Sequence, residues 1–155
     1  MERFYHISRR EISKGATLTQ SIYGERIIDQ STVDNNYNLY IKEKVFEEVR
    51  RNIKPDAPSR LNCVFLYSSL EIARFYWAKE HHYQAYLYEV EIQRGTPFLA
   101  EMDLLHCDGR RYTLIKTNAE KYWSGVFHEN SCTVECLLDG KAKVKALVEG
   151  PSRIW

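Results

Sequence analysis

A short apolar segment runs directly into a predicted helix near the middle of the chain, and this junction does most to limit the possible folds. Residues 62–67 form a compact apolar run that is typical of a buried strand. Ser68 and Ser69 follow at once and precede Glu71, a pattern typical of a helix N-cap with an acid in the first turn. We therefore expect a strand that passes straight into a helix over Glu71–Lys79.

The remaining segments predict more strands than helices. A second helix is expected over Asn38–Asn52, where apolar residues recur at helical spacing, and Pro55 and Pro58 follow it as stop signals. A short helix is expected over Asn118–Tyr122. Alternating or apolar patterns predict further strands over residues 4–8, 85–92, 98–104, 133–138 and 142–148.

The last two predicted strands flank Asp139–Gly140, a two-residue signal for a β-hairpin. Residues 12–36 carry two glycines and indicate a loop with a short helix. Strands outnumber helices and the C-terminal half is rich in hairpin signals, so the expected class is α+β. At 155 residues, without a linker or repeat, the chain is expected to form a single domain over 1–155.

The charge and the cysteines limit the classes of function. The net charge of +1 lacks the basic excess of a strong nucleic-acid binder, so any contact with nucleic acid would be local. No apolar run approaches the roughly 18 residues of a membrane span. Glu2 and Arg3 follow Met1 and no apolar segment comes after them, so a signal peptide is not expected. We expect a cytoplasmic protein with no membrane contact.

The four cysteines are expected to be reduced thiols. They are Cys63, Cys107, Cys132 and Cys136. Cys132 and Cys136 share a spacing that places both on one strand face, but no second pair completes a zinc set. We therefore expect no metal site.

Three separate features carry candidate chemistry. His6 lies in the first predicted strand, where a histidine is most often a hydrogen-bonded core or edge residue. Phe65 or Tyr67 could face Tyr76 across a slot suited to a flat heteroaromatic ring, although core packing is the commoner role. Glu135 lies within an apolar strand, where a carboxylate is costly to bury without a partner.

In this order, the three features resemble the His–Tyr–Glu type of ADP-ribosyltransferase. This group includes the catalytic domain of poly-ADP-ribose polymerases, diphtheria-type toxins and DNA-modifying toxins of the DarT type. The resemblance is carried by Tyr5–His6, by the 65–76 segment and by Val134–Glu135. It implies a split mixed or antiparallel β-sheet core with flanking helices, NAD as co-substrate, and no metal.

The resemblance also implies a role for each residue. His6 would bind a ribose hydroxyl, and the backbone of Ile7 would hold the carboxamide. Tyr76 would stack nicotinamide against Phe65 or Tyr67, with Ser68 beside them. Arg60 could bind an NAD phosphate or lie on the surface. Glu135 would bind the ribose 2′-hydroxyl and orient the acceptor, and the catalytic residues would be Glu135 and His6.

The sequence leaves open the identity of the working acid, the acceptor and the activity itself. Glu101 or Asp103 could replace or assist Glu135 as the acid. The acceptor would be a macromolecule, with nucleic acid favoured over protein, and relatives imply a bacterial toxin or anti-phage effector with a neutralising antitoxin. Because Phe65 lacks a hydroxyl and no glycine follows His6, a degenerate domain that binds a nucleotide or partner is the main alternative. A transferase that modifies a small-molecule drug is another.

Overall fold

The computed structural model describes residues 2–21, 23–129, 131 and 133–152 of the chain. Four α-helices and one 3₁₀ helix lie among seven strands in these residues. The helices are α1 (Tyr23–Gln30), α2 (Tyr37–Ile53), α3 (Leu70–Lys79), η1 (Met102–Leu105) and α4 (Tyr112–Trp123). The strands are β1 (Phe4–Ser8), β2 (Thr17–Leu18), β3 (Val64–Leu66), β4 (Tyr86–Arg94), β5 (Phe98–Glu101), β6 (Val134–Leu138) and β7 (Lys141–Glu149).

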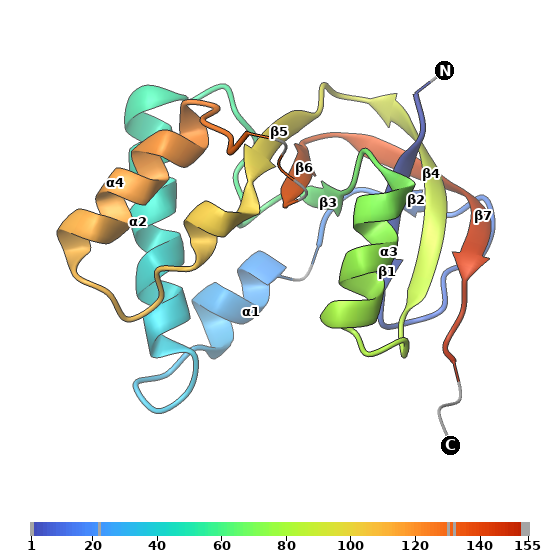
Figure 1. Ribbon diagram of the computed structural model, residues 1–155, viewed down its shortest axis with the longest axis horizontal. Helices are drawn as coiled ribbons and strands as arrows, with labels where there is room; N and C mark the ends of the chain where they lie inside the picture. The colour runs from blue at the N-terminus through green and yellow to red at the C-terminus, as the bar shows by residue number, and fades with distance from the viewer. Residues whose placement is uncertain (1, 22, 130, 132, 153–155) are drawn as a thin grey trace.

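The strands form two antiparallel sheets, which confirms the expected α+β class for a single compact unit. One sheet has the order β1-β4-β7-β2 and the other β3-β6-β5. In Figure 1 the three-stranded sheet lies in the middle, with α2 and α4 on its left and with α3 in front of the four-stranded sheet on the right. The two sheets also meet directly, because Tyr5 of β1 and Tyr67, the residue after β3, exchange two backbone hydrogen bonds of 2.8 Å.

The predicted hairpin at Asp139–Gly140 is wrong. β6 pairs with β3 and β5, whereas β7 pairs with β4 and β2, so this turn carries the chain from one sheet to the other. A Cβ atom on Gly140 would lie 1.9 Å from the carbonyl oxygen of Arg94. The glycine is required because the β4–β5 and β6–β7 connections cross in contact, and not because a tight hairpin turns there.

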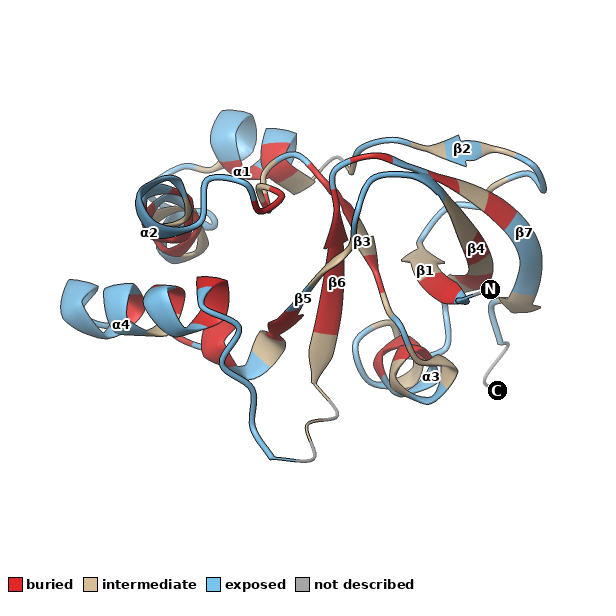
Figure 2. Cartoon of the chain, turned by 90° about the horizontal axis from the view of Figure 1, so that it is seen from above, coloured by how far each residue is buried: buried red, intermediate tan, exposed pale blue. Residues whose placement is uncertain are grey.

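Three clusters of buried side chains pack the helices and the two sheets together. In Figure 2 the buried segments of neighbouring helices and strands face one another. The first cluster joins α2 and α4 to one face of the three-stranded sheet around Phe46 and Leu137. The second fills the space between the sheets around Leu66 and Tyr88. The third packs Ala73 and Trp77 of α3 on the remaining sheet face. Both faces of β4 are therefore covered at its start.

Most predicted elements form within a few residues of the expected bounds. The short helix expected over Asn118–Tyr122 is the much longer α4 (Tyr112–Trp123). The strand expected over residues 98–104 ends at Glu101, whose side chain accepts a hydrogen bond from the Asp103 backbone nitrogen and begins η1. Among the described residues, no helix combines the length and apolar character needed to cross a membrane.

Candidate functional site

A cavity of about 790 Å³ lies where the two sheets meet. Its residues come from the two halves of the molecule, with Glu135 and Arg60 between them. One side is formed by β1, β3 and α3, and the other by α1, α2 and η1. Among the residues that line it are seven of the eight expected from sequence: His6, Ile7, Arg60, Phe65, Tyr67, Tyr76 and Glu135. The chain thus gathers residues up to 129 positions apart (135 minus 6) around one space.

His6 is held by the neighbouring sheet. Its Nδ1 lies 2.9 Å from the carbonyl oxygen of Phe65, and because a carbonyl can only accept, Nδ1 carries the proton. Burial lowers the pKa of His6 below its ordinary 6.5, and the bond to Phe65 opposes this only in part. The neutral ring therefore keeps Nε2 as an acceptor for a hydroxyl group.

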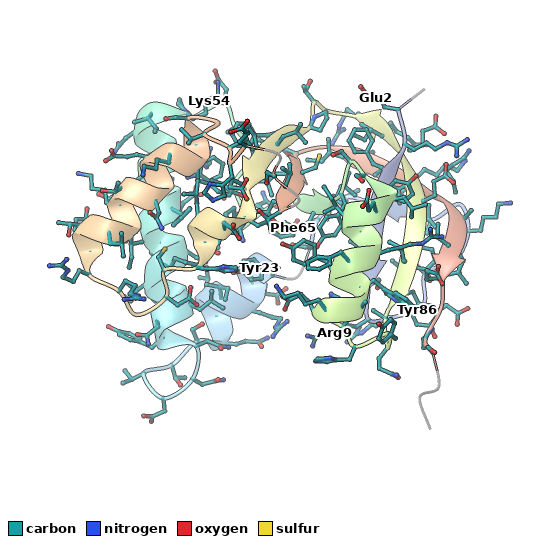
Figure 3. All side chains as sticks on the ribbon, viewed as in Figure 1. Glu2, Arg9, Tyr23, Lys54, Phe65 and Tyr86 are labelled. Carbon is teal, nitrogen blue, oxygen red and sulfur yellow. The ribbon has the colours of Figure 1, made fainter. Side chains whose placement is uncertain are left out.

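The aromatic residues expected to bind nicotinamide do not all face one another: Tyr67 and Tyr76 form one contact, and Phe65 takes part in another. Tyr67 and Tyr76 stack with a centroid distance of 5.7 Å and an angle of 14° between the rings. A ring inserted between them would need two contacts of about 3.5 Å, or roughly 7 Å in all. Phe65 instead meets Tyr23 edge-on at 5.6 Å, and Figure 3 shows both between α1 and α3. Tyr76 therefore faces Tyr67 and not Phe65, and the pair must separate to enclose a third ring.

Glu135 is bound by one of its two carboxylate oxygens. Oε1 accepts hydrogen bonds from Arg60 Nη1 and, at 2.6 Å, from the Tyr122 hydroxyl. Arg60 Nη1 also donates to the Tyr122 oxygen at 2.9 Å, which closes a triangle of three side chains. Burial raises the pKa of Tyr122 well above its ordinary value, so its hydroxyl remains a donor. Glu135 Oε2 accepts no hydrogen bond from the described residues.

Arg60 is a buried ion-paired residue, which corrects both expected roles. Its Nε donates to the two oxygens of Glu43 at 3.2 and 3.1 Å, and it is only 6% exposed. Burial alone would lower the pKa of Arg60, but Glu135 and Glu43 raise it well above its ordinary value. The guanidinium also lies over the rings of Phe65 and Tyr122. It is neither a surface side chain nor a cation free to bind a phosphate.

Sequence reasoning missed the charged residues that α2 contributes to this network. Glu43 accepts a 2.8 Å hydrogen bond from the Tyr23 hydroxyl as well as those from Arg60. Lys42 lines the cavity, donates to the Leu105 carbonyl at 3.1 Å and pairs with Asp108 at 3.0 Å. The sequence predicted the helix but gave no role to its charged residues. Glu43 and Glu47 share one helix face, and this spacing was the available signal.

Two exposed arginines line the cavity at its outer edge. Arg9 follows β1 and lies near the lower end of α3 in Figure 3, while Arg26 lies on α1 across the cavity. Neither has an ion pair with any described residue. His81 lies beside Arg9, and burial, with help from this arginine, lowers the pKa of His81. These arginines are the cations that remain available to an anionic ligand.

The other candidate residues lie outside the cavity. Ser68 is exposed, and the helix cap is Ser69, whose hydroxyl oxygen accepts from the Ile72 nitrogen. Glu101 is buried, and its carboxylate accepts hydrogen bonds from Ser131, Thr133 and two backbone nitrogens. Asp103 is exposed and faces His106 and His128. Neither acid lines the cavity, so Glu135 is the predicted acid that does.

One group of possible metal ligands occurs in the part of the chain described. Cys63, Cys107 and Cys136 are free and buried, and Cys132 lies outside the described residues. Glu101, Asp103 and His128 have ligand atoms within 4.8 Å of one another. The carboxylate of Glu101, however, is already occupied by its four protein donors, which explains its burial without an ion.

Comparison with known proteins identifies the class of this chain at the level of a sequence family. The match spans residues 2–150, which is almost the whole chain and includes every residue of the cavity. The chain belongs to the family described as "Protein of unknown function (DUF2441)". No curated protein matches it significantly.

Proposed function

We propose that this protein is an NAD-dependent ADP-ribosyltransferase whose donor site is the cavity between the two sheets. The observation that carries the proposal is the convergence of His6, Tyr76 and Glu135, from three distant segments, on one cavity of about 790 Å³. That volume lies within the range of roughly 300–1,000 Å³ usual for small-molecule sites. The two antiparallel sheets that meet at β1 and β3 support a split-sheet fold of the transferase type.

The proposed chemistry uses groups that the cavity presents. His6 Nε2 accepts a hydrogen bond from a ribose hydroxyl, and the Ile7 backbone holds the carboxamide. Nicotinamide stacks on Tyr76 after this ring moves away from Tyr67. The bond from ribose C1′ to the nicotinamide nitrogen breaks, and nicotinamide leaves with the bonding electron pair. An acceptor nucleophile bonds to C1′ in its place and loses its proton to solvent. Glu135 Oε2 binds the 2′-hydroxyl and stabilises the positive charge that develops on the ribose.

Arg9 and Arg26 replace Arg60 as the proposed partners of the NAD phosphates. Both line the cavity, are exposed and lack an ion pair among the described residues. A guanidinium group binds a phosphate through two parallel hydrogen bonds. Replacing either arginine with methionine should weaken NAD binding. Arg74→Met should not, because it removes an exposed arginine of α3 that does not line the cavity.

A macromolecular acceptor is proposed on the side of the cavity formed by α1, α2 and η1. Nucleic acid is favoured over protein because the resemblance includes toxins that modify DNA. The proposal of a bacterial toxin or anti-phage effector, with an antitoxin that covers the cavity, rests on the family resemblance.

The test follows labelled NAD into its products. The protein is incubated with adenine-labelled NAD and with RNA, DNA or cell lysate, and the label is sorted into nucleic-acid, protein and small-molecule fractions. We expect label in nucleic acid with the wild type and none with Glu135→Gln. Label in the protein fraction would indicate that the acceptor is a protein. Label attached to a drug-sized acceptor would favour a small-molecule transferase. NAD that remains intact with every acceptor would refute the proposal.

A binding domain without catalysis is the second candidate. Two observations favour it: Glu135 is already paired with Arg60, and Tyr67 and Tyr76 are closed on each other. Calorimetric titration separates the two functions. NAD binding to the wild type that is weakened by His6→Ala, with no release of nicotinamide, would support the binding domain.

A further inference from the structure

We propose that Arg60 and Tyr122 are positioning residues that fix Glu135 by one oxygen and turn the other toward the cavity. This inference rests on the proposed role of Glu135 as the acid of an ADP-ribosyltransferase. It assigns functional roles to a buried arginine and to a tyrosine that does not line the cavity.

The geometry at Glu135 distinguishes its two oxygens. Both donors, Arg60 Nη1 and the Tyr122 hydroxyl, bind Oε1, whereas Oε2 accepts nothing from the described residues. The terminal torsion of a glutamate is broad and roughly two-fold, so a free carboxylate would sample many orientations. Two donors on one oxygen remove that freedom. The second oxygen is then held ready for a hydroxyl in the cavity.

Arg60 is itself fixed from its other side. Glu43, which is 1% exposed, receives two hydrogen bonds from Arg60 Nε and one from Tyr23. The rings of Phe65 and Tyr122 lie 5.3 and 5.6 Å from the centre of the guanidinium. Phe65 thus covers a buried cation with its ring, a role that needs no hydroxyl. Glu43 holds Arg60, and Arg60 holds Glu135.

The Tyr122 hydroxyl can be removed with little change to the core. In Tyr122→Phe the ring keeps its edge-on contacts with Phe46 at 5.4 Å and with Trp123 at 4.8 Å. Glu135 Oε1 loses one of its two donors, so the carboxylate spends less time in the productive orientation. Because Tyr122 does not line the cavity, the NAD contacts themselves are unchanged. We expect kcat to fall between roughly tenfold and 100-fold, with KM for NAD nearly constant.

Two control variants separate positioning from stability. Tyr88 is also buried and its hydroxyl oxygen accepts a 2.7 Å hydrogen bond from Ile12, but it lies outside the cavity. Tyr88→Phe should keep the wild-type kcat. Glu43→Gln should lower kcat because it loosens Arg60. Glu47→Gln, one turn further along α2 and bound to Arg50 and Ser59, should not lower it.

The deciding experiment measures nicotinamide release by the full chain at a series of NAD concentrations, with circular dichroism to report the folded fraction. A fall in kcat at constant KM in Tyr122→Phe and Glu43→Gln, but not in the controls, supports the proposal. Full kcat in folded Tyr122→Phe overturns it and leaves the proposed function standing. A rise in KM alone also overturns it, because Tyr122 would then act in binding. A wild type that releases no nicotinamide overturns the proposed function and this inference together.

Discussion

Replacing Arg60 with methionine tests whether the buried charges around the cavity depend on this one cation. Methionine fills a similar volume without charge, and it leaves Glu43 and Glu135 with side-chain exposures of 0 and 9%. Removing one partner of a buried ion pair costs about 3–5 kcal/mol. Glu135 then has no ion pair with a described residue, whereas Glu43 keeps Lys42, whose Nζ lies 3.9 Å from its Oε1. For a chain of this length, 1 kcal/mol changes Tm by about 2–4 °C. We therefore expect Tm to fall by roughly 6–20 °C.

The matched control is Arg74→Met. Arg74 pairs with Glu149 at 3.3 Å, but the two side chains are 52 and 34% exposed. Such a pair contributes less than about 1 kcal/mol, so Tm should change by only a few degrees. Thermal and denaturant unfolding measure both variants. Adding Glu43→Gln and Glu135→Gln to Arg60→Met should recover a large part of the loss, since no charge is then left unpaired.

The outcome that would refute this reasoning is a loss in Arg60→Met no larger than that in Arg74→Met. Glu43 and Glu135 would then be compensated without Arg60, and the network would not be held by this residue.

Three further predictions follow from the structure. Gly24→Ala would place a Cβ 1.7 Å from the Leu61 carbonyl oxygen, so α1 must move; NAD affinity and Tm should both fall, and unchanged values would show that α1 does not depend on this contact. Burial lowers the pKa of His6, so near pH 6.5 this side chain takes up a proton only in the unfolded chain. The free energy of unfolding should therefore decrease as the pH falls from about 6.5 through the lower folded-state pKa of His6. Denaturant titrations from pH 7 to 5 check this in a His81→Gln background, because the pKa of His81 is also lowered, and an unchanged pH slope in His6→Gln would contradict it. Burial raises the pKa of Cys136 to about 12, so iodoacetamide at pH 8 should modify this thiol only after unfolding, as mass spectrometry of the native and denatured protein would show.

The sequence predicted local elements well because their signals are local. The apolar run before Ser69 formed β3, and the serine caps α3 as expected. The start of α4 was missed because Arg111 occupies its N-cap without a side-chain hydrogen bond, so no capping pattern marks it. The hairpin error has a different cause: Asp139–Gly140 is a local turn signal, but Gly140 is fixed by the distant backbone of Arg94.

The sequence identified most residues of the candidate site but not the contacts between them. The resemblance named His6, Tyr76 and Glu135, and all three line the cavity. It could not indicate that Arg60 faces two carboxylates, because pairing across 17 and 75 residues depends on the tertiary fold. Glu43 was overlooked for the same reason. A charged residue on an amphipathic helix is usually solvated, whereas Glu43 is buried and bound by Arg60 and Tyr23.

The most direct test of the central claim is nicotinamide release from NAD by three forms of the protein: the wild type, Glu135→Gln and Asp103→Asn. Asp103 is exposed, lies outside the cavity and was the competing acid, so its variant controls for the loss of a carboxylate. The account predicts that Asp103→Asn keeps the wild-type rate and that Glu135→Gln lowers it by at least about 100-fold while remaining folded. Equal rates for the wild type and Glu135→Gln would contradict it.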